Sequence, residues 1–417
     1  MPKLKAGRYH FERFLESFHR VISRKERLPG GHLVTIQRSR KFSMQDIDRP
    51  SAASSKLTVV PVKLGARSYQ VRIGAGLSKQ VAIELGNPGS ALVVSDTNVA
   101  PLAGEKLARQ LAEAGWNARL AVQPAGETAK SLREIEKLYD QLIAMQADRS
   151  THVIAVGGGV VGDAAGFAAA TYARGLPFIQ VPTTLLAAVD SSVGGKVGVN
   201  LPAAKNIVGA FHQPKTVFID TDLLATLPPR EFAAGMAEVV KYGMILDESF
   251  FDWLEAEEAR IQSHDPTCLA RIIQRSCELK AQVVEADEFE TTGLRAVLNF
   301  GHTFGHAYEA LAKYGTLLHG EAVSIGMIDA ATLACQLGRI PEDVVARLTK
   351  LLQSFQLPVS LPSETKLDPQ QIIATMRLDK KSVGGKLRLI LPTKIGHVES
   401  VRDVSEALVL KIVARHG

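Results

Sequence analysis

The chain has 417 residues, 46% hydrophobic and 22% charged, a composition typical of a globular protein with large cores, and this length predicts two or at most three domains. The net charge of +6 arises in residues 1–50, which hold twelve Lys/Arg against five Asp/Glu, so that the remaining chain sums to −1 and nothing indicates a nucleic-acid-binding body. Three cysteines without CxxC spacing indicate reduced thiols in a cytosolic protein, and without a charge-free run of eighteen apolar residues we expect no membrane span.

Residues 1–55 form the basic N-terminal arm. Apolar residues between Phe11 and Ile22 recur at helical spacing, whereas the part after Pro29 has the composition of a linker. Three glutamates argue against a mitochondrial presequence, which is poor in acidic residues. We expect a disordered or loosely docked extension that takes no part in the chemistry.

From Leu57 onward the sequence alternates between strand and helix patterns. Two strands, LTVVPVKL and YQVRIG, flank a short turn at Gly65–Ser68. The further predicted elements are a strand at 91–94, a helix at 101–114, a strand at 118–123, a helix from near Ser131 and a strand at 152–156. This alternation predicts a parallel sheet covered on both faces, with ligands bound beyond the carboxyl ends of its strands.

A glycine run, GGGVVGD at 157–163, follows roughly the fourth strand of this pattern. Glycines between a strand and a helix allow backbone N–H groups to approach a diphosphate. The usual dinucleotide fingerprint lies near the first strand. Close packing of helix on strand is therefore an alternative interpretation of this run.

The stretch NFGHTFGH places His302 and His306 four residues apart, on one face of a helix. His319 follows where a loop enters another helix, and Glu238 lies in the apolar helical segment GMAEVVKYGM. Three protein ligands and one open position are typical of catalytic zinc. Hydrogen-bonded core histidines are the alternative, because spacing alone does not establish a metal site.

Several motifs together resemble the 3-dehydroquinate synthase family. They are GGGVVGD, VPTTLLAAVDSSVGGKVGVN, GMAEVVKYG, ELKAQVV, GLRAVLNFGHTFGHA, LHGEAV and LDKK, in the family's order between about Leu57 and Gly396. The resemblance implies an α/β NAD-binding domain with a parallel sheet at 56–222 and a mainly α-helical metal- and substrate-binding domain at 223–417. Two spacings, Glu290 to Arg295 and His306 to His319, are about one residue longer than the family pattern.

The resemblance also implies cofactor sites. Glu238, His302 and His319 match the family's ligands for zinc, and these residue types accept cobalt equally. His306 matches a residue that contacts phosphate and assists proton movement. The residues matching the NAD site are Asp96, Asn98, Glu127, Lys130, Gly158, Gly159, Val160, Asp163, Thr183, Thr184, Leu186, Lys205 and Thr226.

The implied substrate is 3-deoxy-D-arabino-heptulosonate 7-phosphate, which carries a carboxylate and a phosphate. Arg295 with Lys280 is our choice for the carboxylate, because arginine binds carboxylates bidentately. The phosphate set is Lys196, Asn206, Asn299, His306 and Lys380, with Lys381 as the alternative to Lys380. Lys241 adds a cation and Asp190 an acceptor for hydroxyl groups. Arg174 matches an arginine contributed by a neighbouring subunit, so a homodimer is implied.

The implied reaction is redox-neutral. NAD oxidises one hydroxyl, phosphate leaves by β-elimination, the hydride returns, and an intramolecular aldol step gives 3-dehydroquinate. A sister sugar-phosphate cyclase, a polyol or alcohol dehydrogenase and a non-catalytic binding module are the competing functions. A second SVGGK, at 382–386, precedes the alternating segment KLRLIL and predicts a hairpin turn.

Overall fold

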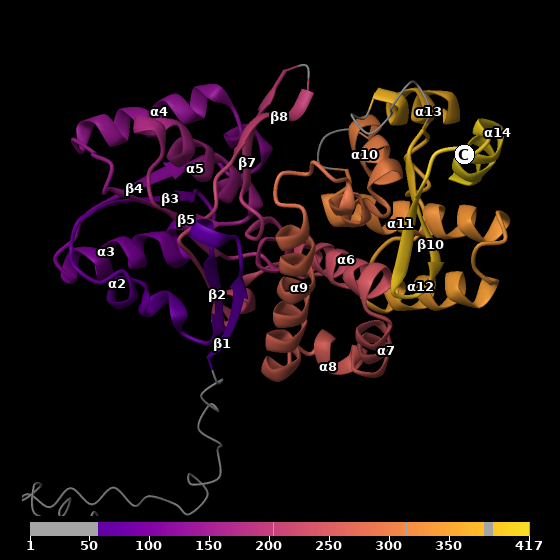
Figure 1. Ribbon diagram of the computed structural model, residues 1–417, viewed down its shortest axis with the longest axis horizontal. Coiled ribbons are helices and arrows are strands. Elements are labelled where there is room, and N and C mark those ends of the chain that lie inside the picture. The colour runs from indigo at the N-terminus through magenta and orange to yellow at the C-terminus, as the bar shows by residue number, and fades with distance from the viewer. Residues whose placement is uncertain (1–56, 203, 313–315, 379–386, 417) are drawn as a thin grey trace, which may run out of the picture. The chain divides into compact units, whose positions relative to one another are not determined.

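The structure, a computed structural model, describes residues 57–202, 204–312, 316–378 and 387–416 (Figure 1). These residues fall within one compact unit. The predicted extension at 1–55, both lysines considered for the phosphate (Lys380 and Lys381), and the second SVGGK lie outside the described residues.

A seven-stranded sheet with strand order β1-β2-β9-β6-β5-β3-β4 forms the N-terminal part. Its strands are β1 Thr58–Val62, β2 Tyr69–Gly74, β3 Ser90–Asp96, β4 Asn117–Gln123, β5 His152–Gly157, β6 Phe178–Pro182 and β9 Thr216–Asp220. All neighbouring pairs are parallel except β1 with β2. The tight turn at Gly65–Arg67 reverses the chain between these two strands, so the parallel prediction holds for the rest of the sheet.

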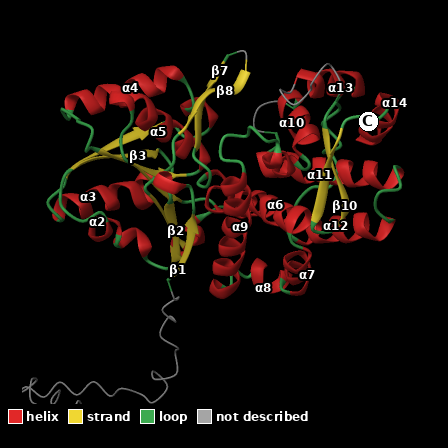
Figure 2. Cartoon of the chain, viewed as in Figure 1, coloured by secondary structure: helices red, strands yellow, loops and turns green. Residues whose placement is uncertain are grey.

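Helices cover both faces of this sheet (Figure 2). They are α2 Val81–Glu84, α3 Glu105–Glu113, α4 Leu132–Ala144 and α5 Gly159–Thr171. Because successive strand side chains point to opposite faces, Leu92 and Val94 pack with α4 and α5, whereas Ala91 and Val93 pack with α3. The resulting continuous apolar strands are typical of parallel sheets buried on both faces.

An antiparallel pair, β7 Lys196–Leu201 and β8 Ala204–Phe211, follows β6 in the chain. Val197 and Val199 of β7 join the core formed by α4 and α5. This contact needs Gly166 of α5, because a Cβ there would lie 2.4 Å from the Val197 side chain. The sequence prediction did not include this hairpin.

The C-terminal part is mainly helical, as expected. Its elements are α6 Pro229–Leu246, α7 Glu248–Ala256, α8 Glu258–Gln262, α9 Pro266–Ala286, α10 His302–Leu311, α11 His319–Gln336, α12 Glu342–Ser354, α13 Pro369–Leu378, β10 Leu389–Lys394, β11 His397–Val401 and α14 Glu406–Val413. The largest core joins these helices to residues of β1, β2 and β9, so sheet and helices share apolar packing. None of the described helices is long and apolar enough to cross a bilayer.

Candidate metal and substrate site

Three side chains from three helices converge in the helical part. Glu238 lies in the middle of α6, His302 begins α10 and His319 begins α11. One ligand atom from each lies within 4.8 Å of the others. The structure thus brings together the three residues predicted to bind metal.

Hydrogen bonds orient each of these side chains. The Nδ1 atom of His302 lies 3.1 Å from the Phe300 carbonyl oxygen, so a proton on Nδ1 leaves Nε2 as the ligand atom, 3.6 Å from Glu238 Oε1. The Nδ1 atom of His319 lies 3.1 Å from Glu309 Oε2. Such partners fix the tautomer and orientation of metal-binding histidines.

The Glu238 carboxylate is almost fully buried. Its Oε2 atom accepts a hydrogen bond from Lys241, whereas Oε1 has no hydrogen-bond partner in the part of the chain that the structure describes. A buried polar atom without a partner is costly unless a ligand satisfies it. The donor set and this open oxygen fit a divalent cation held by one carboxylate and two imidazoles.

Glycines allow α10 and α11 to approach closely enough for this convergence. Gly301 precedes His302 with a φ of 78°, the left-handed region that favours glycine. A Cβ on Gly326 of α11 would lie 2.1 Å from the Gly301 carbonyl oxygen. The pair Gly301–His302 therefore combines a candidate metal ligand with the glycine whose backbone contact positions it.

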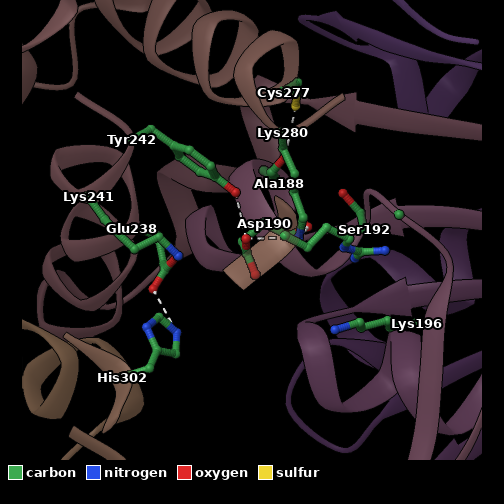
Figure 3. A network of polar contacts seen from close by, with 12 residues as sticks. Ala188, Asp190, Ser192, Lys196, Glu238, Lys241, Tyr242, Cys277, Lys280 and His302 are labelled. Carbon is green, nitrogen blue, oxygen red and sulfur yellow. Dashed lines mark hydrogen bonds and ion pairs between the residues drawn. The ribbon is translucent and has the colours of Figure 1, made fainter. Parts of the chain in front are cut away.

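A second polar network lies beside the metal residues (Figure 3). Asp190 Oδ1 accepts hydrogen bonds from the Tyr242 hydroxyl at 2.6 Å and from Lys280 Nζ at 2.8 Å. Lys280 also donates to the Asp190 carbonyl oxygen at 2.5 Å. Burial raises the pKa of Asp190, but the Lys280 and Lys241 charges and these hydrogen bonds outweigh it and hold that pKa well below its usual range. Burial lowers the pKa of Lys280, which the Asp190 charge only partly offsets.

Arg295 lies against the same segment, at Gly194. Its guanidinium is buried and donates from Nη1 to the Glu288 carbonyl oxygen at 2.8 Å. A Cβ on Gly194 would lie 3.1 Å from Arg295 Nη2, so the glycine admits this side chain. Lys280 and Arg295, the pair predicted to bind the carboxylate, thus flank one turn at 190–194.

Glu290 pairs with two of the predicted substrate-binding cations. It forms an ion pair with Lys196, and its Oε1 lies 3.5 Å from Arg295 Nε. Its φ of 57° is unusual for a residue with a side chain. The Glu290 carboxylate therefore lies between Lys196, which was assigned to the substrate phosphate, and Arg295, which was assigned to the substrate carboxylate.

Several predicted NAD residues meet around a buried lysine. Lys130 Nζ donates to Asp163 Oδ2 at 2.7 Å and to Asn206 Oδ1 at 2.6 Å, which ties the turn before α4 to α5 and β8. Burial raises the pKa of Asp163 and the Lys130 charge opposes this effect. Asn206 was assigned to the substrate phosphate, and the structure places it next to two residues assigned to NAD.

Other predicted NAD residues lie at the carboxyl ends of the strands. Asp96, at the end of β3, accepts hydrogen bonds from the backbone N–H groups of Asn98 and Val99 at 2.8 and 2.9 Å. Within the described residues, Thr183 Oγ1 and Glu127 Oε2 are buried without a hydrogen bond. Strand ends of a parallel sheet are where ligands of such folds bind.

The glycine run follows β5, the fifth strand in the chain, and begins α5. Cβ atoms on Gly158 and Gly159 would lie 3.1 Å from Thr184 Cγ2 and 3.0 Å from Ser191 Oγ. These contacts show that the run packs closely on the segment after β6, and they leave both interpretations of the run open. A phosphate cradle formed by Gly158, Gly159 and the adjoining Val160 stays a prediction.

The remaining predicted residues are more scattered. Lys205 donates to Glu309 Oε1 at 2.8 Å, and Glu309 in turn contacts His319, so this predicted NAD residue is linked to His319 through one carboxylate. Thr226 donates to the Leu223 carbonyl oxygen, and Leu186 is half-buried just before the turn that carries Asp190. Asn299 ends the helical turn Leu294–Asn299. Arg174 is exposed, with a φ of 68°, at the opposite end of α5 from Gly159.

His306 lies beside the metal residues, as the helical pair predicted. Its ring centroid is 5.3 Å from that of His302 and 5.9 Å from that of His319. Sequence reasoning missed two residues of this region, Tyr242 and Glu309. Glu309 lies seven residues after His302, the spacing of one helix face, and this signal could have identified it.

Comparison with known proteins gives consistent matches over most of the chain. Residues 120–234 match the family model described as 3-dehydroquinate synthase N-terminal, and residues 235–382 match 3-dehydroquinate synthase C-terminal. The 3-dehydroquinate synthase of Desulforamulus reducens is 48% identical over 359 residues, covering 85% of this chain and 99% of that protein. The enzyme of the same name from Rhodopirellula baltica is 47% identical over 365 residues, covering 85% and 96%.

Solved structures of sugar-phosphate cyclases share the fold. A 2-deoxy-scyllo-inosose synthase complexed with carbaglucose-6-phosphate, NAD+ and Co2+ has a TM-score of 0.76 and 29% identity, covering 86% of this chain and all of that chain. The 2-epi-5-epi-valiolone synthase of Streptomyces hygroscopicus, with NAD+ and Zn2+ bound, has a TM-score of 0.76 and 32% identity, covering 86% and 99%. An iron-containing alcohol dehydrogenase from Thermococcus thioreducens, at 14% identity and a TM-score of 0.59, shares the fold alone.

Proposed function

The chain belongs to the 3-dehydroquinate synthase family, and from this premise we propose that it converts 3-deoxy-D-arabino-heptulosonate 7-phosphate to 3-dehydroquinate and phosphate. The reaction is a lyase step of the shikimate pathway. NAD and a divalent metal ion serve as cofactors, as they do in the structures of related cyclases.

Glu238, His302 and His319 would hold the metal ion. The open Glu238 Oε1 atom and the Nδ1 hydrogen bonds of both histidines support this assignment. A metal ion held by these residues would supply Lewis-acid chemistry toward substrate hydroxyl groups. His306, next to both histidines, is the group for moving a proton near the leaving phosphate.

NAD would lie along the carboxyl ends of β3, β5 and β6. Asp96 would accept from ribose hydroxyls, and the buried oxygens of Glu127 and Thr183 offer unused hydrogen-bonding capacity in this region. NAD bound there would supply reversible hydride transfer. Lys130 holds Asp163 and Asn206 in place at the boundary between the NAD and substrate regions.

The observation that carries the substrate assignment is the placement of Arg295 and Lys280 around the turn at 190–194. Both side chains are buried, and a buried arginine can grip a carboxylate with two parallel hydrogen bonds. Substrates of the sister cyclases, such as glucose 6-phosphate, lack the carboxylate. The phosphate would be bound by Lys196, Asn206, Asn299 and His306. Its binding would displace Glu290 from its ion pair with Lys196.

A phosphate-release assay with three substrates tests this assignment. Purified protein with NAD and zinc should release phosphate from the heptulosonate phosphate but not from glucose 6-phosphate or sedoheptulose 7-phosphate. Arg295→Met should lower kcat/KM by about 100-fold, the equivalent of one charge-assisted pair of about 3 kcal/mol. The control Arg271→Met, which removes a cation lying over the Trp253 ring, should keep wild-type activity. Phosphate release from glucose 6-phosphate or sedoheptulose 7-phosphate, without release from the heptulosonate phosphate, would show that the enzyme is a sister sugar-phosphate cyclase.

Finer features belong to the same proposal. We take zinc or cobalt as the ion, a homodimer in which Arg174 reaches the neighbouring subunit, and the cytoplasm as the compartment. The three cysteines, all free thiols, support a reducing compartment. The proposed division at 222/223 falls in the turn Thr221–Thr226 between β9 and α6.

A further inference from the structure

Helices α6 and α11 carry two of the three metal residues and touch through their backbones. A Cβ on Gly320 would lie 1.9 Å from the Ala234 carbonyl oxygen, so the first turn of α11 lies directly on α6. His319 immediately precedes this glycine, and Glu238 follows Ala234 by about one turn. A small shift of the α11 N-terminus would therefore move His319 relative to Glu238.

A bidentate ion pair spans the same contact. Arg230, in the first turn of α6, donates to Glu321 Oε1 from Nε at 2.6 Å and to Oε2 from Nη2 at 2.7 Å. Glu321 Oε2 also accepts from the Leu318 backbone N–H at 2.8 Å. Arg230 Nη2 donates in addition to the Thr316 carbonyl oxygen at 2.9 Å.

These four hydrogen bonds converge on the segment that leads into His319. Thr316 and Leu318 lie before it, and Glu321 lies two residues after it. Arg230 anchors the segment on α6, about two turns before Glu238. Glu321 is only 9% exposed, so removing Arg230 would leave a mostly buried carboxylate without its charge partner.

We propose that Arg230 and Glu321 are positioning residues that hold His319 at ligand distance from Glu238. The pair, with its bonds to Thr316 and Leu318, is named here the α6–α11 clamp. Its role in metal affinity rests on the metal site of the proposed function. The clamp itself acts on the backbone around His319 whether or not an ion is bound.

The alternative is a salt bridge that contributes to global stability and nothing more. Exposed pairs contribute little, and half of the Arg230 side chain is exposed. A stability role alone would speed exchange at protected amides throughout the protein, not over residues 316–322 in particular, and would leave the metal affinity of the folded protein unchanged. These two quantities therefore separate the two roles.

Two variants break the clamp with small changes. Arg230→Lys keeps the charge but loses the planar fork, and Glu321→Gln keeps one acceptor but loses the charge. The matched control is Arg347→Lys, because Arg347 of α12 makes a similar bidentate pair with Glu255 of α7, at 3.1 and 2.5 Å, and neither helix carries a metal residue.

The experiment measures two quantities on the full chain. Zinc affinity is obtained by competition with a chromophoric chelator, and amide hydrogen exchange over residues 316–322 is recorded on the metal-free protein. We expect both clamp variants to bind zinc about 10- to 100-fold more weakly and to exchange the Leu318 amide faster. Arg347→Lys should change neither quantity.

The outcomes distinguish the clamp from the proposed function. Unchanged exchange at 316–322, or zinc affinity within twofold of wild type despite faster exchange, would overturn the clamp. If the wild-type protein binds no zinc, the metal site of the proposed function fails, and hydrogen exchange alone decides whether the clamp orders the His319 segment.

Discussion

Glu238 is a buried carboxylate and Asp190 a partly exposed one, each paired with a lysine, and they differ in their hydrogen bonds. Asp190 uses one oxygen for both Tyr242 and Lys280. Glu238 gives Oε2 to Lys241 and leaves Oε1 without a hydrogen bond among the described residues. The open oxygen faces His302, so Glu238 is suited to ligate an ion and Asp190 to orient hydroxyl groups.

Glu238→Gln should weaken zinc binding by more than about 100-fold, because an amide oxygen is a poorer ligand and the change removes the anion from the site. Equilibrium dialysis with zinc measures this directly. Glu278→Gln is the matched control, since Glu278 pairs with Arg275 on α9. Retention of one tightly bound zinc by Glu238→Gln would show that the ligand assignment is wrong.

At this scale the sequence predicted the convergence of Glu238, His302 and His319 through resemblance to a family. It missed Tyr242 because a tyrosine in an apolar helix is typical of a core residue. It also missed Glu309, whose partners Lys205 and His319 come from elements distant in the chain. Hydrogen bonds between such elements depend on packing that spacing does not encode.

Among the elements, the link between α9 and Arg295 is ordered by one side chain. Asp287 directly follows α9, and its carboxylate accepts hydrogen bonds from the backbone N–H groups of Thr291 at 2.9 Å, Thr292 at 3.1 Å and Arg295 at 3.4 Å. Burial would raise the pKa of Asp287, but these hydrogen bonds lower it to about 2. The ionised carboxylate therefore fixes the loop that delivers Arg295 to the substrate region.

The lowered pKa of Asp287 makes the free energy of unfolding depend on pH in a defined range. A carboxyl group with a pKa near 2 when folded and about 3.9 when unfolded stabilises the fold fully above pH 3.9, and the contribution is lost as pH falls toward 2. The difference in unfolding free energy between wild type and Asp287→Asn should shrink by about half between pH 6 and pH 3. Urea unfolding at both pH values measures it, and a difference independent of pH would contradict the assigned role.

The elements themselves were predictable to different degrees. Strands β1 to β5 were placed within a few residues, because each is bounded by turn residues and carries a continuous or alternating apolar pattern. The hairpin β7–β8 was missed, since its glycine-rich sequence resembles a binding loop. The segment KLRLIL was predicted to alternate, but strand β10 begins only at Leu389, where its pairing with β11 ends at Val401, and its first four residues are all buried.

At the scale of the whole molecule, one core joins the sheet to the helices. Residues of β1, β2 and β9 pack in the same apolar cluster as α6, α9 and α11. The boundary predicted at 222/223 therefore separates two segments of chain that share a core. Composition and periodicity do not reveal this sharing, because it depends on which sheet face each helix covers.

This arrangement places the NAD residues at the strand ends and the metal residues on α6, α10 and α11, which share an apolar core with β1, β2 and β9. The turn with Asp190 belongs to the sheet part, and its partners Tyr242 and Lys280 belong to helices α6 and α9. A reaction that needs a hydride carrier, a metal ion and several cations at one substrate is consistent with this convergence. We expect the converging residues to perform an internal, redox-neutral reaction.

The most direct test records phosphate release and nicotinamide reduction together, with the heptulosonate phosphate as substrate. The reaction is run with and without NAD, and with a chelator followed by added zinc. We predict that phosphate release requires both cofactors, returns when zinc is restored and proceeds without net accumulation of NADH. Accumulation of NADH in step with turnover, or release that is indifferent to the chelator, would contradict the account.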